Sequence, residues 1–519
     1  MLSFNRMKIF FKILKRIIMK PIYKRNIFLL ILSALALFSC NDFLDKNPLD
    51  VLSNESFWAT EAEVEMALTG CYSRLNDEPW FGYRRTLLDC LTDNVQNKYA
   101  SSDYGYILSI GRGTITETTG GLISDMWSSS YSGISTCNNF LDNVDNVKLN
   151  SNSRKQYIGE VRFLRAFFYF QLVHYFGDVI IYTSCPETVE AGKIAKSSKE
   201  DVLALIHADL DSAISYLPDN LYSEGHAVKG SALALKTRVL MYEENYEDAA
   251  STAFQIIDSK TFKLYDDYQK MFLTSGQEKN NEIMFSVKYY GEDYTSMDQE
   301  LILWAAPMVR QELVDDYECT DGKSITESPL YDENNPFENR DPRLSMSIMP
   351  DTDTLFTSDG KIFNPDPTYT GYFQLKYVDL SALPISTSTR SEQDMIILRY
   401  ADVLLMYAEA QNEVSGPDAT VYSAINDVRE RVHMPDIETG LDQDQMREVI
   451  RHERRVELAL EGLRYYDIKR WKIAHEIMPK VNDVGGNTIV FENPKNYTWP
   501  IQETELDLNP KLIQNTYYQ

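Results

Sequence analysis

Histidine, cysteine and the common catalytic signatures are scarce or missing in this sequence. The 519 residues include six histidines and six cysteines, which are scattered along the chain. The chain has no Gly-x-Ser-x-Gly elbow, no phosphate-binding P-loop and no zinc-binding His-Glu-x-x-His helix. Carboxylate pairs such as Asp315 with Asp316 could serve a glycosidase, but 77 acidic residues produce such pairs by chance. We therefore expect no catalytic activity.

The apolar runs are too short to span a membrane as a helix. The strongest candidate covers residues 27–39, whereas a spanning helix needs about 20 apolar residues. Three basic residues precede this run, Ser39 ends it and Cys40 follows, which resembles a bacterial lipobox. We expect a signal peptide over 1–39, with Met19 as an alternative start, lipid attachment at Cys40, and a lipidated tether over 40–56. The alternative is a plain signal peptide or a buried helix with an incidental cysteine.

Positive charge is also scarce, with a formal net charge of −26. Residues 1–39 carry eight Lys or Arg and no acid, so the remainder is more acidic still. A field of this sign disfavours nucleic acid and anionic ligands as partners. Apart from Cys40, an odd number of cysteines remains, so no complete disulfide framework is expected. These five are Cys71, Cys90, Cys137, Cys185 and Cys319.

Helical periodicity is abundant outside one long stretch. The strongest pattern, 157–176, has apolar residues three or four apart, and its second half is apolar nearly all round, which predicts a buried helix. Two pairs of helices carry small alanines where helices approach closely, as tetratricopeptide hairpins do. We therefore predict an all-α fold built on tetratricopeptide-type hairpins. The expected helices are 61–75, 127–144, 157–176, 201–217, 229–242, 246–258, 395–413, 420–432 and 442–471.

The helical period is lost over residues 262–390. This stretch is rich in Asp, Asn, Pro and Thr, with short apolar bursts such as 283–290, and predicts loops with a few short strands. A non-helical insert of this length in a helical protein is usually functional. We expect an N-terminal helical region over 57–260 and a C-terminal region over 261–519, which contains this insert and the helices between 395 and 475.

Aromatic residues gather in two of the expected loop regions. A sugar ring stacks its apolar C–H face on an aromatic ring while its hydroxyls need polar partners, and Asp93 and Asn94 lie near the first group. For any single aromatic residue, a place in the core is the more frequent role. Tyr99 and Tyr106 also belong to the first group. The candidate ligand-binding residues are Trp80, Phe81, Tyr83, Tyr104, Tyr289, Tyr290, Trp304, Asp93 and Asn94.

A charged series near the C-terminus resembles a catalytic cluster until it is placed on a helix. Its spacings of three and four then make it a ladder of ion pairs on one face, which indicates a structural role. No twelve-residue calcium loop is present, so a structural calcium stays an open alternative and no other cofactor is expected. The series is Glu453, Arg454, Glu457, Glu461, Arg464, Asp467 and Arg470.

Several motifs together resemble the SusD/RagB family of outer-membrane nutrient-binding lipoproteins. Cys40 is followed by NDFLDKNP, and four further stretches resemble family motifs in the helical regions. The tail WPIQETELDLNPKLIQN covers 499–515, so the resemblance extends over the whole mature chain. The four helical stretches are EVRFLRAFFYFQLVHYFGDV at 160–179, ILRYADVLLMYAEAQNEV at 397–414, INDVRERVHMP at 425–435 and IRHERRVELALEGLRYYDIKRW at 450–471.

The resemblance implies a cell-surface, outer-membrane lipoprotein without catalytic activity. Such a protein captures an oligosaccharide or polysaccharide and delivers it to a SusC-like TonB-dependent transporter, over which it acts as a lid. A RagB-like peptide-binding protein is the main alternative. A carbohydrate-active enzyme and a purely structural scaffold are the others. Binding residues vary within the family, so the resemblance assigns no role to the aromatic candidates. Its motif residues Arg162, Arg165, Glu453, Arg454, Glu457 and Arg470 indicate scaffold.

Overall fold

The computed structural model describes residues 57–77, 79–99, 104–291, 299–386 and 388–519. The expected signal peptide, the lipid attachment at Cys40 and the tether lie outside these residues. The chain divides into two compact units, 1–63 and 64–519, and the larger one contains nearly all of the described residues. No helix in the described residues is both long and apolar enough to cross a bilayer. All five remaining cysteines are free thiols.

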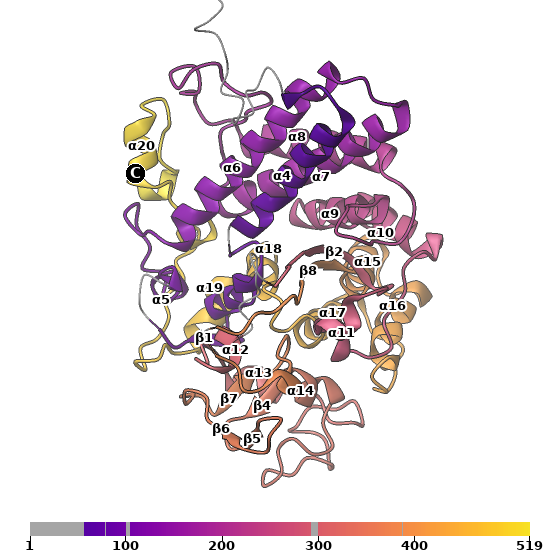
Figure 1. The fold of residues 1–519 in the computed structure, drawn as a ribbon. Coiled ribbons are helices and arrows are strands. Elements are labelled where there is room, and N and C mark those ends of the chain that lie inside the picture. The colour runs from indigo at the N-terminus through magenta and orange to yellow at the C-terminus, as the bar shows by residue number, and fades with distance from the viewer. Residues whose placement is uncertain (1–56, 78, 100–103, 292–298, 387) are drawn as a thin grey trace, which may run out of the picture. The chain divides into compact units, whose positions relative to one another are not determined.

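Long helices make up the first part of the larger unit, where α4, α6, α7 and α8 lie side by side (Figure 1). α7 packs against α6 and α8, and it is buried without interruption from Ile158 to Phe176 apart from the half-buried Arg162, as its apolar surface predicts. The Asn150 side chain caps its start and Gly177, with a φ of 72°, follows its end. The bounds are α4 (Glu61–Asp77), α6 (Leu122–Asn143), α7 (Ser151–Phe176) and α8 (Lys199–Tyr216).

The two predicted helical hairpins are present, and they pack on each other. α9 (Lys229–Tyr242) and α10 (Tyr246–Ser259) form the first; α15 (Tyr400–Ser415) and α16 (Ala419–Glu430) form the second, and α10 packs against α15. The all-α, tetratricopeptide-type scaffold is therefore confirmed.

The helix expected from residue 395 begins only at Tyr400. Residues Met395–Arg399 form strand β8, which pairs antiparallel with β2 (Ile283–Val287) from the insert. Every residue of both strands is buried. A short, fully buried apolar run fits a strand and a helix equally well, and only the distant partner strand decides between them.

The insert contains short strands and short helices, as its loss of helical period predicts. A four-stranded sheet has the order β1-β3-β7-β4, and β5 pairs with β6 in a separate hairpin (Figure 1). Three short helices, α12, α13 and α14, accompany them. The bounds are β1 (Val95–Asn97), β3 (Pro307–Val309), β4 (Ile348–Pro350), β5 (Leu355–Phe356), β6 (Ile362–Phe363), β7 (Tyr372–Gln374), α12 (Gln299–Ile302), α13 (Gln311–Asp316) and α14 (Pro342–Ser347).

The helix expected over 442–471 is in fact two helices, α17 (Gln443–Glu457) and α18 (Arg464–Arg470). The predicted cap at Asp442 is confirmed, since its side chain accepts from the Gln445 backbone N–H and the Gln445 side chain accepts from the Asp442 backbone N–H. The chain turns at Gly462, whose φ is 73° and where a Cβ would lie 2.3 Å from the Arg85 carbonyl oxygen. This close approach requires glycine and fixes the turn between the end of α17 at Glu457 and the start of α18 at Arg464.

The charged series on α17 and α18 has a structural role, but it is not a surface ladder. Glu457 is buried and lies 2.6 Å from Arg399, 2.5 Å from Arg431 and 3.0 Å from Arg343. Although burial alone would raise the pKa of Glu457, the three guanidinium groups hold it well below its usual range. The partners come from α14, β8 and the end of α16, so these ion pairs join separate elements instead of successive turns of one helix.

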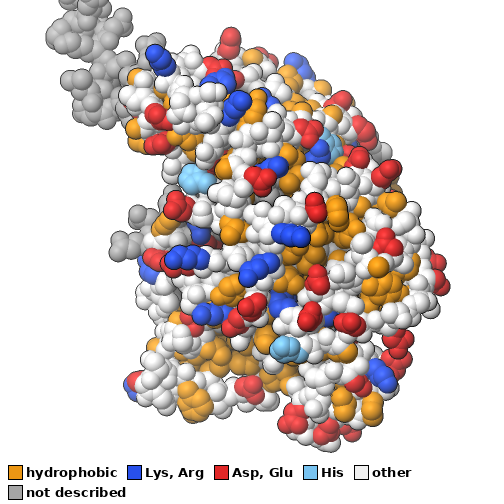
Figure 2. Space-filling model, turned by 90° about the vertical axis from the view of Figure 1, so that its right-hand side faces the viewer, with side chains coloured by type: hydrophobic (Ala, Val, Ile, Leu, Met, Phe, Trp, Pro, Cys, Tyr) orange, Lys and Arg blue, Asp and Glu red, His pale blue; other side chains and the backbone are white. Residues whose placement is uncertain are grey.

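Charges at the surface are also mixed in sign. On the face shown in Figure 2, acidic and basic side chains lie among one another, with hydrophobic side chains between them. The strong net negative charge is therefore not gathered into one patch on this face.

Candidate functional site

The pairing of β1 with β3 brings the two predicted aromatic groups together. Val95 lies opposite Val309 and Asn97 opposite Pro307, so the residues that follow β1 run beside those that precede β3. The Lys98 backbone N–H donates to the Ala306 carbonyl at 3.1 Å. Two segments about 200 positions apart in sequence therefore form one surface.

Tyr99 holds this surface together through its hydroxyl. The hydroxyl oxygen lies 3.0 Å from the Trp304 carbonyl oxygen and 2.9 Å from the Asp366 carboxylate, so the two acceptors share its single proton. Burial and the Asp366 carboxylate both raise the pKa of Tyr99, so the group stays a protonated donor at neutral pH. Lys98 adds an ammonium group 3.4 Å from Asp366.

Aromatic rings continue from Tyr99 towards the start of the first 3₁₀ helix, η1 (Tyr83–Leu91). Tyr99 and Tyr104 are stacked, with ring centroids 4.7 Å apart and planes 18° from parallel. The Arg84 guanidinium lies 5.9 Å from the Tyr104 ring centroid and 5.8 Å from that of Tyr83. Rings and cations therefore alternate along this stretch.

Tyr369 extends the same surface from the loop before β7. Its side chain is 71% exposed, and Lys98 Nζ lies 5.8 Å from its ring centroid. We call the whole set the aromatic surface. It consists of Tyr83, Arg84, Lys98, Tyr99, Tyr104, Trp304, Asp366 and Tyr369.

Two predicted residues, Trp80 and Phe81, are part of the core. Their side chains are 1% and 0% exposed. Trp80 Nε1 donates to Asp125 at 3.3 Å, and Phe81 packs against the rings of Phe167 and Phe168. A sugar could not reach either ring face, so the expected stacking role is wrong for both.

Asp93 and Asn94 are bound by arginines of the C-terminal helices. Arg464 donates to both oxygens of Asp93 at 2.9 Å, and Arg455 Nε donates to Asn94 Oδ1 at 2.8 Å. Burial would raise the pKa of Asp93, but Arg455 and Arg464 lower it well below its usual range. Both side chains are buried, and the arginines hold them in the scaffold, although Asn94 Nδ2 has no hydrogen-bond partner among the described residues.

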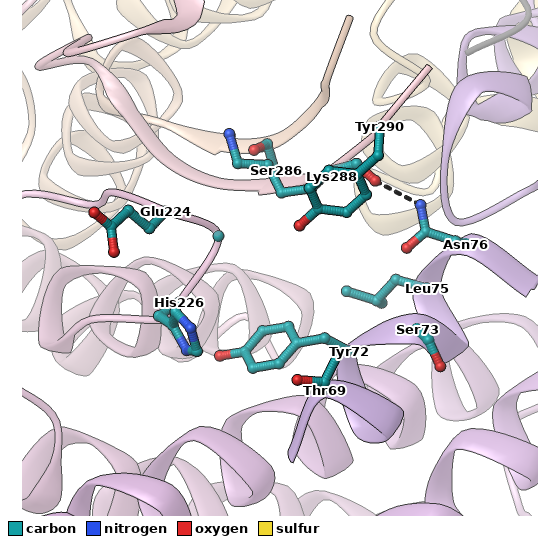
Figure 3. A pocket seen from close by; sticks show the side chains of 11 residues that line it. Thr69, Tyr72, Ser73, Leu75, Asn76, Glu224, His226, Ser286, Lys288 and Tyr290 are labelled. Carbon is teal, nitrogen blue, oxygen red and sulfur yellow. Dashed lines mark hydrogen bonds between the residues drawn. The ribbon is translucent and has the colours of Figure 1, made fainter. Parts of the chain in front are cut away.

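The two tyrosines that follow β2 have different surroundings. Tyr289 is buried, and its hydroxyl accepts from the Tyr83 backbone N–H at 2.9 Å, so it positions the aromatic surface from behind. Tyr290 is 66% exposed and lines a separate cleft with Tyr72, Asn76 and His226 (Figure 3). That cleft has a volume of about 170 Å³, below the range of about 300–1,000 Å³ that small-molecule sites occupy.

The Figure 3 cleft is closed on one side by a buried hydrogen-bond network. His226 Nδ1 lies 2.7 Å from the Glu160 carboxylate, and the Tyr72 hydroxyl donates to the same carboxylate at 2.6 Å. The hydrogen bond to Glu160 raises the pKa of His226. Asn76 Nδ2 donates to the Lys288 carbonyl at 2.6 Å (Figure 3). These bonds fasten the 222–228 turn and the residues after β2 to the helices, which is a structural role.

Sequence reasoning missed four members of the aromatic surface, Arg84, Lys98, Asp366 and Tyr369. The only signal for the last two was their place in the insert that we expected to be functional. In the residues that the structure describes, no three His, Cys, Asp or Glu side chains are grouped as a metal site requires.

Comparison with known proteins decides the family. The SusD family model matches residues 269–518, and a second model, described as starch-binding associating with outer membrane, matches residues 42–241. The chain belongs to the SusD/RagB family. The two matches lie on either side of residue 260, where the sequence predicts a boundary between two regions. In the structure, residues 64–519 form one compact unit, and the boundary stays a prediction.

Relatives and solved structures agree with this assignment along the chain. SusD-like protein P2 of Formosa agariphila is 28% identical over 501 residues, which cover 93% of this chain and 97% of the relative. The crystal structure of a SusD-like carbohydrate binding protein from Bacteroides fragilis has a TM-score of 0.79 at 29% identity and covers 88% of this chain and 100% of that one. A second SusD-like protein of that organism has a TM-score of 0.78 at 26% identity, with coverage of 91% and 100%.

Proposed function

We propose that this SusD-like protein captures an oligosaccharide or polysaccharide on the aromatic surface and delivers it to a SusC-like TonB-dependent transporter. The observation that carries the proposal is the Tyr99 arrangement, which stacks one ring on Tyr104 and holds Trp304 and Asp366 beside it. A relative named as carbohydrate binding shares the fold over its whole length, which supports the same ligand class here.

The surface suits a neutral sugar chain physically. The Tyr99 ring is half-buried and already stacked on Tyr104, so little of its side-chain freedom would be lost on binding, and Trp304 beside it is half-buried as well. Asp366 accepts from sugar hydroxyls, and Lys98 and Arg84 donate to them. The exposed Tyr369 and the half-buried Tyr83, Tyr99 and Trp304 would contact sugar units of one chain, while the buried Tyr104 supports the Tyr99 ring.

We propose binding without hydrolysis. Glycosidases use two carboxyl groups about 5–10 Å apart on either side of the scissile bond. Asp366 is the single carboxylate among the residues that form the aromatic surface, and it already accepts from Tyr99. The protein would therefore hand on its ligand unchanged.

The placement that we propose is an outward-facing protein on the outer membrane, anchored by a lipid at Cys40. The family description that names the outer membrane supports it, together with the order of residues before Cys40. A Cys40→Ala variant should then leave the membrane fraction. Continued sedimentation of that variant with membranes after a salt wash would contradict the lipid anchor.

The binding experiment compares variants of the aromatic surface with a matched exposed tyrosine. A panel of polysaccharides and peptide digests is screened by affinity electrophoresis and calorimetry. For the glycan found, Trp304→Ala and Tyr369→Ala should weaken binding, by about 5- to 100-fold for one lost stack, whereas Tyr290→Ala in the Figure 3 cleft should not. Binding of a peptide and no glycan would favour the RagB-like function. Equal loss from Tyr290→Ala would place the site elsewhere.

A further inference from the structure

A second cavity lies among the helices and shares no residue with the aromatic surface. Its volume is about 440 Å³, within the range of about 300–1,000 Å³ for small-molecule sites. The ends of α7, α9 and α18, the start of α8 and residues 493–498 line it. Tyr242 and Tyr497 contribute aromatic walls, so the cavity has both apolar and polar surface.

Lys469 on α18 is a buried cation in this cavity without an acidic partner. Its side chain is 6% exposed, and Nζ lies 5.4 and 5.1 Å from the ring centroids of Tyr175 and Tyr465. Its one hydrogen bond within the described part of the chain is to the His174 carbonyl oxygen at 3.3 Å. Burial and the nearby Lys199 ammonium lower the pKa of Lys469 to about 7, as expected of a buried lysine without a counter-ion.

Lys199, at the first position of α8, adds a second unpaired ammonium group to the same cavity. Its Nζ lies 4.2 Å from the Tyr242 ring centroid, and burial lowers its pKa as well. Over the described ranges no carboxylate lies within 4.0 Å of either Lys199 or Lys469. Two ammonium groups that share a cavity repel each other, and an anion between them would relieve that repulsion.

His174 lines the same cavity with unused hydrogen-bonding capacity. Its side chain is nine-tenths buried, and neither ring nitrogen has a hydrogen-bond partner among the described residues. Burial, with Lys469 and other cations nearby, lowers the pKa of His174, so the ring is neutral and presents one N–H donor. An unsatisfied buried polar group costs about 1–3 kcal/mol, and such groups usually have a functional reason.

The acids at the edge of the cavity pair with other side chains, although Glu200, Glu243 and Glu244 still attract the Lys199 ammonium at longer range. Glu243 lies 2.6 Å from His207, and Glu244 is paired with Lys472. Arg470 beside the cavity is paired with Glu409 and Asp467. Lys199 and Lys469 therefore leave a local positive charge in a protein whose net charge is −26.

We propose that this cavity binds the carboxylate of a small organic acid. The Lys469 and Lys199 ammonium groups and the His174 N–H would donate to the carboxylate oxygens, and the Tyr242 and Tyr497 rings would contact the rest of the molecule. The carboxylate can belong to an acidic sugar or to a free organic acid, which present the same chemistry to the cavity. The sequence-based expectation that disfavoured anionic ligands considered only the net charge, and this site depends on local charge.

The first test titrates the full chain in detergent with glucuronate, glucose and lactate by calorimetry in a weakly anionic buffer. Glucuronate should bind and glucose, which has the same ring without the carboxylate, should not. Lactate binding as tightly as glucuronate would identify a free organic acid, whereas clearly tighter glucuronate would identify an acidic sugar. Equal binding of glucose and glucuronate, or no binding of either acid at 10 mM or so, would overturn the proposal.

Variants then locate the site. Lys469→Met removes the charge but keeps an unbranched side chain between the tyrosine rings, and it should weaken binding of the acid by about 10- to 100-fold, the effect of one charge-assisted hydrogen bond. Lys361→Met is the matched control, since Lys361 is paired with Asp359 and does not line the cavity, and it should bind normally. If Lys469→Met does not fold, binding of the acid is measured with Lys199→Met instead, because Lys199 is the more exposed of the two lysines. Unchanged affinity in the folded lysine variant would overturn the proposal.

This inference does not depend on the proposed glycan function. Trp304→Ala should leave glucuronate binding unchanged, and Lys469→Met should leave binding of a neutral polysaccharide unchanged. Loss of both activities in either variant would show instead that the two sites are one.

Discussion

The molecule contains two sets of buried charges that are treated in opposite ways. Glu457 on α17 meets guanidinium groups from α14, β8 and the end of α16, and Asp467 on α18 pairs with Arg454 and Arg470. In the cavity beside α18, Lys469 and Lys199 are close together and their carboxylate partners are missing within the described residues. Paired buried charges join elements of a scaffold, whereas unpaired ones leave a favourable place for a ligand of opposite sign.

The largest loss of stability is expected when one charge is removed from the paired set. Glu457→Gln leaves Arg343, Arg399 and Arg431 buried with less compensating charge, and we expect a loss of about 3–5 kcal/mol in the free energy of unfolding. Urea denaturation followed by circular dichroism measures it. A loss below about 1 kcal/mol would show that the network is not what holds α17 to the insert.

Removing a charge from the unpaired set should raise the free energy of unfolding, which is the opposite of the effect expected for Glu457→Gln. Lys469 has a pKa of about 7 in the folded protein, far below its unfolded value, so the unfolded state binds more protons between pH 7 and about 10.5. The penalty of the buried ammonium is fully present below pH 7 and disappears as the pH rises through that window. Lys469→Met should therefore stabilise the protein at pH 6, on the order of 2 kcal/mol, and have no such advantage near pH 10.5.

Denaturation midpoints of Lys469→Met and the parent protein, measured from pH 6 to 10 in a buffer of low anion content, test this prediction. Lys361→Met is the control, because Lys361 is exposed, paired with Asp359 and outside the cavity. A destabilised Lys469→Met at pH 6 would mean that the lysine has a stabilising partner.

Removal of one hydroxyl group from the aromatic surface should affect glycan affinity more than stability. Tyr99→Phe keeps the ring that stacks on Tyr104 but removes the hydroxyl that fastens Trp304 and Asp366, so we expect about a 5- to 10-fold loss of glycan affinity. The free energy of unfolding should fall by only about 1 kcal/mol.

Tyr407→Phe in the helical scaffold is the matched control for Tyr99→Phe. It removes one hydroxyl bond, to Thr420 at 2.9 Å, and should leave glycan affinity unchanged. If Tyr99→Phe and Tyr407→Phe lose glycan affinity to the same extent, the Tyr99 hydroxyl does not position the aromatic surface.

The smallest effect is expected where a charge pair is exposed. Lys361 lies 2.5 Å from Asp359 with both side chains largely in solvent, and Lys361→Ala should change the free energy of unfolding by less than about 1 kcal/mol. The same urea titration used for Glu457→Gln gives the value. An effect as large as that of Glu457→Gln would contradict the distinction between buried and exposed pairs.

Much of the helical scaffold could be predicted because its signals are local. The apolar surface of α7, the stop at Gly177 and the cap at Asp442 all depend on residues within a few positions of one another. The strand β8 could not be predicted in this way, since its partner β2 lies more than a hundred residues earlier. The break between α17 and α18 likewise depends on Gly462 meeting the Arg85 carbonyl.

The candidate site was predictable only as two aromatic groups. That Tyr99 and Trp304 are neighbours follows from the pairing of β1 with β3, which local sequence does not reveal. The same folding turns Asp93 and Asn94 towards Arg464 and Arg455, and buries Trp80 and Phe81, although all four are close to Tyr83 in sequence. Neighbours in a loop can face opposite sides of it, so proximity in sequence does not assign a side chain to a surface.

Local sequence therefore determined the helices and their caps, and the recurring motifs determined the family to which the chain belongs. Tertiary structure alone decided which aromatic rings are exposed and which charges are paired. The physical reason is range: helix periodicity and capping act over three or four residues, whereas burial and the pairing of charges depend on segments that meet only after the chain has folded. The unpaired Lys469 and the fully paired Glu457 lie twelve residues apart in one charged stretch, and only the fold distinguishes them.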